Sequence, residues 1–338
     1  MQDVLLLSRL DLERVLDPPS VIGALEGAFR ADHLGEWDTP RRIAARTRAG
    51  SLLAMPSGGG SPEGLGAKFA TIFPGNRALG IPSVCGLYAL FDPGTGVPLV
   101  VMDGGFLTLI RTAAVSAVAT KLLSRPDAAT LGVFGAGAQA EFHVRLMALV
   151  RPIKSVVIWA RRRDTAALLV ASLRSRPELR QVSKWTAAEA PEEAAGCDIV
   201  VTATGATEPV LAGRWLTPGA YVNPIGTHMR NAREVDAETV ARASVLAIET
   251  ADTLAEAGDL QMAQAEVGGV VDRVTTLGAL LDPGRSPTAR DPEAITLFKS
   301  CGVAFEDLAV AVLAFERASR DEDPRRFDFS GIDSPHTE

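Results

Sequence analysis

The stretch TLGVFGAGAQAEFHVRL at residues 130–146 decides the fold of this chain. Its apolar run TLGVF predicts a strand, and the GAGAQA turn that follows, residues 135–140, fits the pattern G-x-G-x-x-A at the start of a helix. In such a strand–turn–helix unit the glycines permit a tight turn and close approach of a pyrophosphate, and the helix amides face the phosphates. A tight packing turn without a ligand is the alternative. The pattern assigns these residues to a dinucleotide: Gly135, Gly137, Ala138, Gln139 and Ala140.

Strands and helices alternate after this turn. We expect strands at residues 130–135, 155–160, 198–205, 220–226 and 244–249, and helices between them at residues 139–150, 165–175 and 232–243. The alternation is typical of right-handed βαβ crossovers and predicts an α/β domain, a Rossmann doubly wound parallel sheet. The ends of the third and fourth strands are assigned to the cofactor as well: Thr202, Ala203, Thr204, Ile225 and Gly226.

The residues after the second strand bear on the choice of coenzyme. Sites that prefer NAD usually place an acidic residue there for the ribose hydroxyls, whereas this chain has the run Arg161-Arg162-Arg163. A guanidinium suits a 2′-phosphate, so Arg161 and Arg162 favour NADP(H), with NAD(H) as the second possibility. A solvated run of charges without a ligand is the alternative interpretation.

A different pattern precedes the cofactor turn. The first thirty residues have helical apolar spacing, and residues 42–106 contain short apolar runs cut by Gly and Pro, which predict a mainly antiparallel or mixed sheet. Residues 107–123 predict a long buried helix, and residues 291–319 predict one final helix that returns to the first unit. We therefore expect a discontinuous α+β substrate-binding and dimerisation domain, residues 1–118 plus 308–338, with a Rossmann domain of residues 119–307 inserted in it.

Composition excludes several classes of function. Apolar residues make up 47% of the chain and charged residues 22%, and the net charge of −7 gives no basic field for nucleic acid or an anionic membrane. No stretch approaches the roughly 18–20 apolar residues that span a bilayer, and the N-terminus lacks the pattern of a signal peptide. The three cysteines and four histidines have no metal-ligand spacing. We expect a cytoplasmic globular protein with no metal, no nucleic-acid partner and no membrane partner.

Three charged residues stand in unusual contexts. Lys68 interrupts the apolar run AKFATI, Arg111 lies in an Ala-rich helix, and Asp236 precedes the helix-forming stretch AETVARA. Each has a structural alternative: an edge lysine whose amine reaches water, a structural ion pair, and a helix N-cap. In the functional interpretation a partly desolvated Lys68 holds a carboxylate, and Asp236 exchanges a proton with a substrate nitrogen or activates water.

Several segments together resemble a known family. KFATIFPGN (68–76), FGAGAQAEFH (134–143), IGTHMRNAREVD (225–236), EAGDL (256–260) and ITLFKSCGVAFEDLAVA (295–311) resemble, in this order, the ornithine cyclodeaminase/mu-crystallin family. The RTAA helix start within TGVPLVVMDGGFLTLIRTAAVSAVATKLL (95–123) does so too. The resemblance covers nearly the whole chain. It implies a two-domain, usually homodimeric, NAD(P)-dependent enzyme that acts on amino acids and imines.

The resemblance also implies roles for single residues. Lys68 and Asp236 are expected to be catalytic. Arg42, Lys68 and Arg111 are expected to bind the substrate carboxylate, with Arg41 and Arg46 as alternatives to Arg42. Met55 is expected to contact the substrate. Arg111 and Thr112 are expected to contact the coenzyme, Thr112 at its pyrophosphate. Ser300 and Gly302 are expected to lie near the nicotinamide.

The expected activity is hydride transfer between a nicotinamide and the α-carbon of a small amino or imino acid. This corresponds to an NADPH-dependent reductase of imines or to an amino acid dehydrogenase, and the expected substrate is a cyclic ketimine or an imine formed from a 2-oxo acid and an amine. An ornithine or lysine cyclodeaminase, which releases ammonia with recycled NAD, is the second choice because residues 226–236 depart from the glycine- and acid-containing segment of ornithine cyclodeaminases. A ligand-binding protein without catalysis is the third.

Overall fold

The structure, a computed structural model, describes residues 3–284, 291–320 and 325–327. The chain forms two compact units, residues 1–111 with 303–338, and residues 112–302. The second unit is therefore an insertion in the first. The predicted boundaries, after residues 118 and 307, lie a few residues later, within helices α3 (Gly104–Leu123) and α11 (Ala304–Ala318). Residues 321–324 and 328–338 of the predicted C-terminal piece lie outside the described residues.

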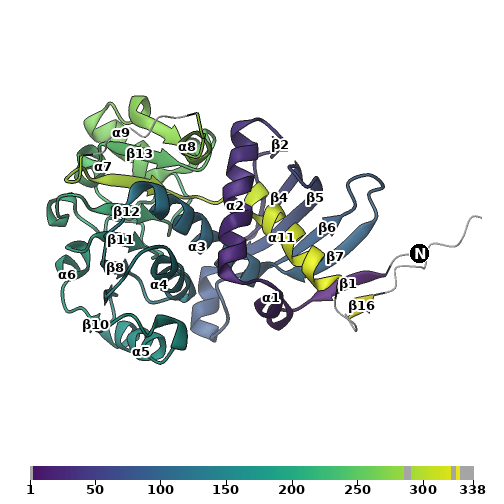
Figure 1. Cartoon of the computed structure of the whole chain (residues 1–338), viewed down its shortest axis with the longest axis horizontal. Coiled ribbons are helices and arrows are strands. Elements are labelled where there is room, and N and C mark those ends of the chain that lie inside the picture. The colour runs from purple at the N-terminus through teal and green to yellow at the C-terminus, as the bar shows by residue number, and fades with distance from the viewer. Residues whose placement is uncertain (1–2, 285–290, 321–324, 328–338) are drawn as a thin grey trace, which may run out of the picture. The chain divides into compact units, whose positions relative to one another are not determined.

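The first unit is built on a mixed sheet with the order β16-β1-β7-β6-β5-β4-β2, in which β3 also pairs with β4. The β1–β7 pair is parallel, and the other pairs are antiparallel. Helices α2 and α11 lie along one face of this sheet (Figure 1). The elements are β1 (Val4–Leu7), α1 (Arg9–Val15), α2 (Pro18–His33), β2 (Trp37–Asp38), β3 (Ile43–Arg46), β4 (Ser51–Gly59), β5 (Gly64–Ile72), β6 (Val84–Phe91), β7 (Pro98–Asp103), α11 and β16 (Arg326–Phe327).

The two faces of this sheet differ in burial. Along β4 and β5 alternate residues are buried, as the two-residue period of a strand requires when one face is covered. Met55, Lys68, Tyr88 and Met102 face each other across β4 to β7 and are buried. On the opposite face Phe69 pairs with Leu87, and both remain exposed.

Helix α3 carries the chain from one unit into the other. Its twenty residues are long and apolar enough to cross a membrane, but 78% of its most apolar window is buried inside the protein. Such burial is typical of a core helix. Ala113, Ala114, Ala117 and Val118, for example, have no exposed surface.

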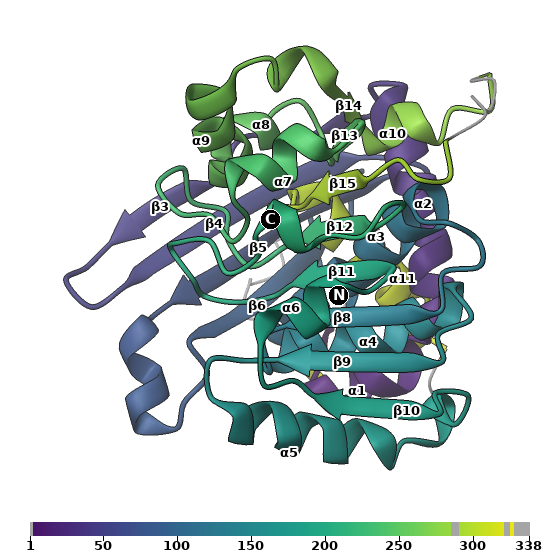
Figure 2. The same ribbon diagram turned by 90° about the vertical axis from the view of Figure 1, so that its left-hand side faces the viewer.

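The second unit contains a parallel sheet with the order β10-β9-β8-β11-β12-β15-β13-β14 (Figure 2). Its first six strands have the arrangement of two mononucleotide-binding halves that diverge from β8 and β11, which confirms the predicted Rossmann fold. The elements are β8 (Thr130–Phe134), α4 (Ala138–Val150), β9 (Ser155–Trp159), α5 (Arg163–Arg174), β10 (Lys184–Ala187), α6 (Pro191–Ala195), β11 (Ile199–Thr202), β12 (Tyr221–Pro224), α7 (Ala237–Arg242), β13 (Val245–Ile248), α8 (Thr253–Glu256), α9 (Gly258–Val267), β14 (Val274–Thr276), α10 (Leu277–Leu280) and β15 (Thr296–Lys299).

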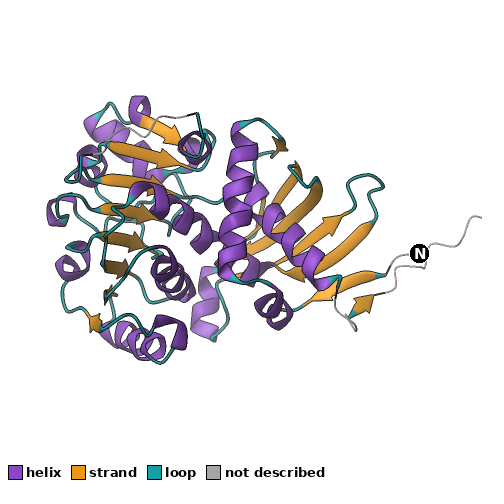
Figure 3. Cartoon of the chain, in the orientation of Figure 1, coloured by secondary structure: helices purple, strands orange, loops and turns teal. Residues whose placement is uncertain are grey.

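Two sequence predictions of helices are wrong. The expected final helix over residues 291–319 is divided into β15 and α11, as the alternation of strands and helices in Figure 3 shows. Between them Gly302 has φ of 79°, a left-handed conformation that interrupts a helix. The expected helix over residues 232–243 begins only at Ala237, because the amides of Glu234 and Val235 donate to the carboxylate of Asp259 instead of to a helical turn.

Candidate active-site residues

The dinucleotide turn has the geometry that its sequence predicts. Gly135 has φ of 113°, and a Cβ there would lie 2.4 Å from the carbonyl oxygen of Ala203, so a side chain is excluded. Gly137 is the N-cap of α4, is exposed, and has no heavy atom within 4 Å of where a Cβ would stand. Ala138 is exposed as well, Gln139 is half-buried, and Ala140 is fully buried. The start of this helix is therefore open at Gly137, as the approach of a phosphate to helix amides requires.

The ends of β11 and β12 are held by one buried carboxylate, that of Glu234. Its oxygens accept hydrogen bonds from the Thr202 hydroxyl at 2.8 Å, the Thr204 amide at 2.7 Å and the Gly226 amide at 2.6 Å. Burial raises the pKa of this carboxyl group, although the nearby Lys299 opposes the shift. The predicted cofactor residues Thr202 to Thr204 and Ile225 to Gly226 are thereby brought to the same edge of the sheet, at the carboxyl ends of its strands.

A buried ion pair fixes the loop that follows β12. The Lys299 ammonium lies 2.8 Å from Asp259 Oδ2 and donates to the Thr227 carbonyl at 2.7 Å. Burial disfavours the charge on Lys299, but Asp259, Cys301 and Glu234 outweigh this effect and raise the pKa of Lys299 to about 12. Lys299 therefore stays charged and fixes the chain after β12 to the end of β15.

The arginine run follows β9 directly, as predicted. Arg161, Arg162 and Arg163 are all exposed at the carboxyl end of this strand, beside β8. Arg163 lies 3.0 Å from Glu189. Arg161 and Arg162 thus stand at the position where a dinucleotide fold contacts the 2′ substituent of the adenosine ribose.

The predicted nicotinamide segment is a turn after β15. Ser300 and Gly302 are buried, and Cys301 is partly exposed. All three donate hydrogen bonds to the buried carboxylate of Glu249, at the end of β13. Thr112, the other predicted coenzyme contact in this unit, is 7% exposed on α3.

The first unit contains a compact cluster of charges. Lys68 Nζ lies 2.6 Å from Asp307 Oδ2, Arg111 Nε lies 3.1 Å from Asp307 Oδ1, and Arg111 Nη1 lies 2.8 Å from Glu306 Oε2. The four side chains are at most 6% exposed. Burial lowers the pKa of Lys68 to about 8, an effect that Arg111 reinforces and Asp307 opposes. Two of the three cations predicted to bind a carboxylate, Lys68 and Arg111, therefore converge on the carboxylate of Asp307.

The strand register shows where the candidate arginines of the N-terminal segment lie relative to Lys68. Lys68 pairs with Met55 of β4, and Ala54 pairs with Ile43 of β3, so Arg42 extends β3 at the position next to Met55. Arg42 immediately precedes β3, so its place on the face of Lys68 is an extension of this register and not a paired position. Arg46 pairs with Ser51 at the far end of the hairpin and is excluded from this row.

Asp236 lies in the second unit as the N-cap of α7. Its Oδ1 accepts hydrogen bonds from the Thr239 amide at 2.8 Å, the Thr239 hydroxyl at 2.7 Å and the Gly213 amide at 2.9 Å. Its structural alternative, a helix cap, is therefore realised. A catalytic role for Asp236 stays a prediction.

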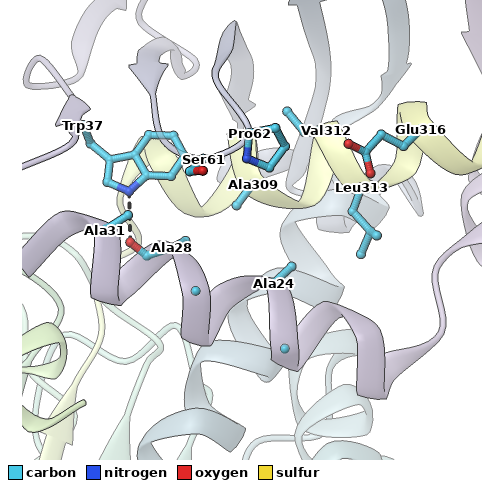
Figure 4. Close-up of a pocket in the computed structure, with 12 residues that line it drawn as sticks. Ala24, Ala28, Ala31, Trp37, Ser61, Pro62, Ala309, Val312, Leu313 and Glu316 are labelled. Carbon is cyan, nitrogen blue, oxygen red and sulfur yellow. Dashed lines mark hydrogen bonds between the residues drawn. The ribbon is translucent and has the colours of Figure 1, made fainter. Parts of the chain in front are cut away.

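A pocket of about 280 Å³ lies elsewhere in the first unit, between α2 and α11 (Figure 4). Trp37, whose indole donates to the Ala28 carbonyl, closes one end, and Glu316 lies at the other. The residues that line this pocket do not include Arg42, Met55, Lys68 or Arg111. It is therefore separate from the predicted carboxylate site.

Sequence reasoning missed the acidic partners of these residues. Glu306 and Asp307 have no exposed surface although they lie in the first turn of an amphipathic helix, and Glu234, Glu249 and Asp259 are equally buried. One signal was available: Lys299 interrupts the apolar run ITLF just as Lys68 interrupts AKFATI, and buried cations require anionic partners. The identity of those partners depends on contacts between residues that are distant in sequence.

Comparison with known proteins agrees with the family resemblance of the sequence. The profile of the ornithine cyclodeaminase/mu-crystallin family matches residues 2–322. The alanine dehydrogenase of Archaeoglobus fulgidus is 32% identical over 317 residues, which cover 94% of this chain and 95% of the relative. The ketimine reductase mu-crystallin of Mus musculus is 35% identical over 268 residues, which cover 79% of this chain and 80% of the relative.

A solved structure is similar over its whole length. It is Δ1-pyrroline-2-carboxylate reductase of Thermococcus litoralis in complex with NADH and L-proline, with a TM-score of 0.90 and 33% identity over 96% of this chain and 100% of that chain. The names of these relatives describe an amino acid dehydrogenase and reductases of imines, which is the predicted class of activity. Because the profile match spans nearly the whole sequence, this chain belongs to the ornithine cyclodeaminase/mu-crystallin family.

Proposed function

We propose that this protein is a nicotinamide-dependent reductase of imino acids, which in the reverse direction is an amino acid dehydrogenase. The observation that carries the proposal is the convergence of Lys68 and Arg111 on a single carboxylate inside the first unit. The second unit, with its dinucleotide turn at residues 135–140, supplies the coenzyme site. The relatives reduce cyclic imines or oxidise amino acids, so a small 2-imino acid is the proposed substrate class.

The carboxylate site follows from donor capacity. A lysine ammonium has three N–H donors and a guanidinium has five. Among the described residues Lys68 makes one hydrogen bond, to Asp307, and Arg42 immediately precedes β3, which pairs with β4. Charge-assisted, bidentate contacts from Lys68, Arg111 and Arg42 would fix the α-carboxylate of the substrate and so orient its α-carbon.

The coenzyme supplies or accepts the hydride, and this chain's residues bind and orient it. We propose NADPH as the preferred form, with NADH as a weaker substitute. The exposed Arg161 and Arg162 support this preference, because no acidic side chain stands in their place after β9. Asp236 is proposed to exchange the proton of the substrate nitrogen.

We also propose that the protein is a homodimer in the cytoplasm. Ile43, Phe69 and Leu87 lie in one row on the uncovered face of the first sheet, and they are 68%, 38% and 45% exposed. A contiguous apolar face of this kind is typical of an isologous interface. The cytoplasmic location is supported by three free cysteines, Cys85, Cys197 and Cys301.

The activity is tested by following NADPH absorbance with purified protein. Δ1-Pyrroline-2-carboxylate, Δ1-piperideine-2-carboxylate, and pyruvate with methylamine serve as substrates, and parallel reactions contain NADH. Imine-dependent oxidation of the coenzyme supports the reductase. Release of ammonia from ornithine or lysine with NAD⁺ and no net redox change, in the absence of imine reduction, would instead establish a cyclodeaminase.

A further inference from the structure

One carboxylate, that of Glu249, accepts hydrogen bonds from all three residues of the turn after β15, and the Ser300 amide also donates to the Pro224 carbonyl at 3.3 Å. Strand β15 lies between β12 and β13 and ends at Lys299, so Ser300, Cys301 and Gly302 stand at the carboxyl edge of the sheet. Gly302 has φ of 79°, which turns the chain away from the strand direction before α11 begins. An irregular segment of this kind depends on side chains for its hydrogen bonds.

Glu249 accepts the hydrogen bonds of the donors in this turn. The Ser300 hydroxyl donates to its Oε1 at 2.6 Å, the Cys301 amide to its Oε2 at 2.8 Å, and the Gly302 amide to both oxygens at 2.9 and 3.0 Å. The Thr253 hydroxyl, from the first turn of α8, approaches Oε2 at 3.3 Å. Glu249 has no exposed surface, and each of these contacts uses it as an acceptor.

The position of this turn in the sheet links it to the coenzyme. In a doubly wound sheet of two halves, the half that begins with β8 takes the adenosine, and the half of β11, β12 and β15 takes the other nucleotide. The turn at residues 300–302 is the carboxyl end of one strand of that second half. In the proposed function, the nicotinamide therefore packs against the backbone of this turn.

We propose that Glu249 is a positioning residue for hydride transfer: by binding the amides of Cys301 and Gly302 and the hydroxyl of Ser300, it sets the height and angle of the nicotinamide. This inference rests on the proposed function. In this proposal Glu249 acts only through the turn at residues 300–302 and does not contact the substrate. Charge-assisted hydrogen bonds to backbone amides are strong and directional, and small displacements of reacting atoms cost large factors in rate.

The test compares Glu249→Gln and Glu249→Asp with the wild type. Glutamine keeps the length of the side chain but turns an –NH₂ group toward amides that need an acceptor, whereas aspartate keeps both acceptors and is one methylene shorter. The matched control is Glu192→Gln, an exposed carboxylate on α6 of the same unit. The readouts are kcat with NADPH and Δ1-pyrroline-2-carboxylate, the Kd of NADPH, and the fluorescence emission of bound NADPH, which reports the surroundings of the nicotinamide.

We expect Glu249→Gln to lower kcat by about 10- to 100-fold. The Kd of NADPH should change by less than about threefold, because the adenosine half of the site is intact. The emission of the bound nicotinamide should shift toward that of free NADPH, with partial recovery of kcat and emission in Glu249→Asp. If Glu249→Gln does not fold, Ser300→Ala, which removes one of the donors, gives the same readouts.

The outcomes separate this inference from the proposed function. Unchanged kcat and unchanged emission in a folded Glu249→Gln variant overturn the positioning role. A loss of kcat that is matched by loss of NADPH binding and a lower melting temperature also overturns it, since a structural role alone accounts for that pattern. If the wild type reduces no imine, the proposed function fails, and the emission of bound NADPH still decides whether Glu249 places the nicotinamide.

Discussion

Lys68 and Asp307 are 239 positions apart in the sequence, yet Nζ and Oδ2 lie 2.6 Å from each other with almost no exposed surface on either side chain. The contact joins β5 to the first turn of α11, the two pieces of the first unit that the inserted second unit separates in sequence. Arg111 shares the same carboxylate through its Nε. The carboxylate site therefore exists only when both pieces of the discontinuous unit have come together.

This relationship separates a structural from a functional role of Lys68. In Lys68→Met the buried carboxylate of Asp307 loses one of its two cations, and breaking a buried pair costs about 3–5 kcal/mol of folding free energy. The double variant Lys68→Met with Asp307→Leu leaves Arg111 paired with Glu306 and should regain most of that stability. Its kcat/KM should stay low, because the cation for the substrate carboxylate is absent. Denaturant unfolding and NADPH oxidation measure the two effects. Recovery of turnover in the double variant would show that Lys68 is purely structural.

The pH dependence of activity should report the burial of Lys68. Because burial lowers its pKa to about 8, Lys68 is charged below that pH and becomes neutral as the pH rises through it. Since the charge holds the substrate carboxylate in the proposed site, KM for the imino acid should rise above pH 8. Lys68→Arg is the control, because a guanidinium keeps its charge over this range and should remove the step from the profile. A step that persists in Lys68→Arg would assign the titration to another group.

Coenzyme preference should depend on Arg161 and Arg162 and not on Arg163. Replacing Arg161 and Arg162 by alanine should raise KM for NADPH by about tenfold or more, since charge-assisted contacts to the 2′-phosphate are lost, and should leave KM for NADH nearly unchanged. Arg163→Ala is the matched control, because Arg163 is an exposed neighbour that pairs with Glu189. Steady-state kinetics with both coenzymes provide the comparison. Equal losses for NADPH and NADH would contradict the NADP assignment.

Asp236 can be tested without removing its helix cap. In Asp236→Asn the amide oxygen still accepts from Thr239 and Gly213, so stability should fall by less than about 1 kcal/mol, the typical value of a whole cap. If Asp236 carries the proton of the reaction, kcat should fall by about 10²–10⁴. The melting temperature and kcat of Asn and Ala variants distinguish the roles. Full activity in Asp236→Asn would show that Asp236 only caps the helix and has no catalytic role.

The proposed dimer predicts an effect of charge on the uncovered sheet face. Phe69→Asp and Leu87→Asp, made singly, should shift the molecular mass in solution from that of a dimer toward that of a monomer, because a desolvated carboxylate at an apolar interface is costly. Leu168→Asp, at an exposed apolar residue of α5, is the control and should leave the mass unchanged. Analytical ultracentrifugation measures all three. A monomeric wild type would refute the homodimer.

The sequence by itself determined the local features of this protein. The GAGAQA turn, the apolar runs around it and the arginines after β9 involve neighbouring residues, whose backbone conformation and spacing follow from steric and hydrophobic periodicity. For that reason the Rossmann fold, the turn at Gly135 and the place of Arg161 after the second strand could be predicted before any contact was known. The same periodicity failed at residues 291–319, where an apolar strand and an amphipathic helix were joined in one prediction until the left-handed Gly302 divided them.

Tertiary structure alone decided how charge is compensated. Lys68 and Lys299 are conspicuous in their apolar runs, but their partners Asp307 and Asp259 come from other elements, and Glu249 reaches the turn at Ser300 from a neighbouring strand. Register in the sheet pairs Arg46 with Ser51 and thereby separates it from the pair of Met55 and Lys68. Such choices depend on which distant segments are packed together, because the free energy of a buried charge is set by the atoms around it and not by its neighbours in sequence.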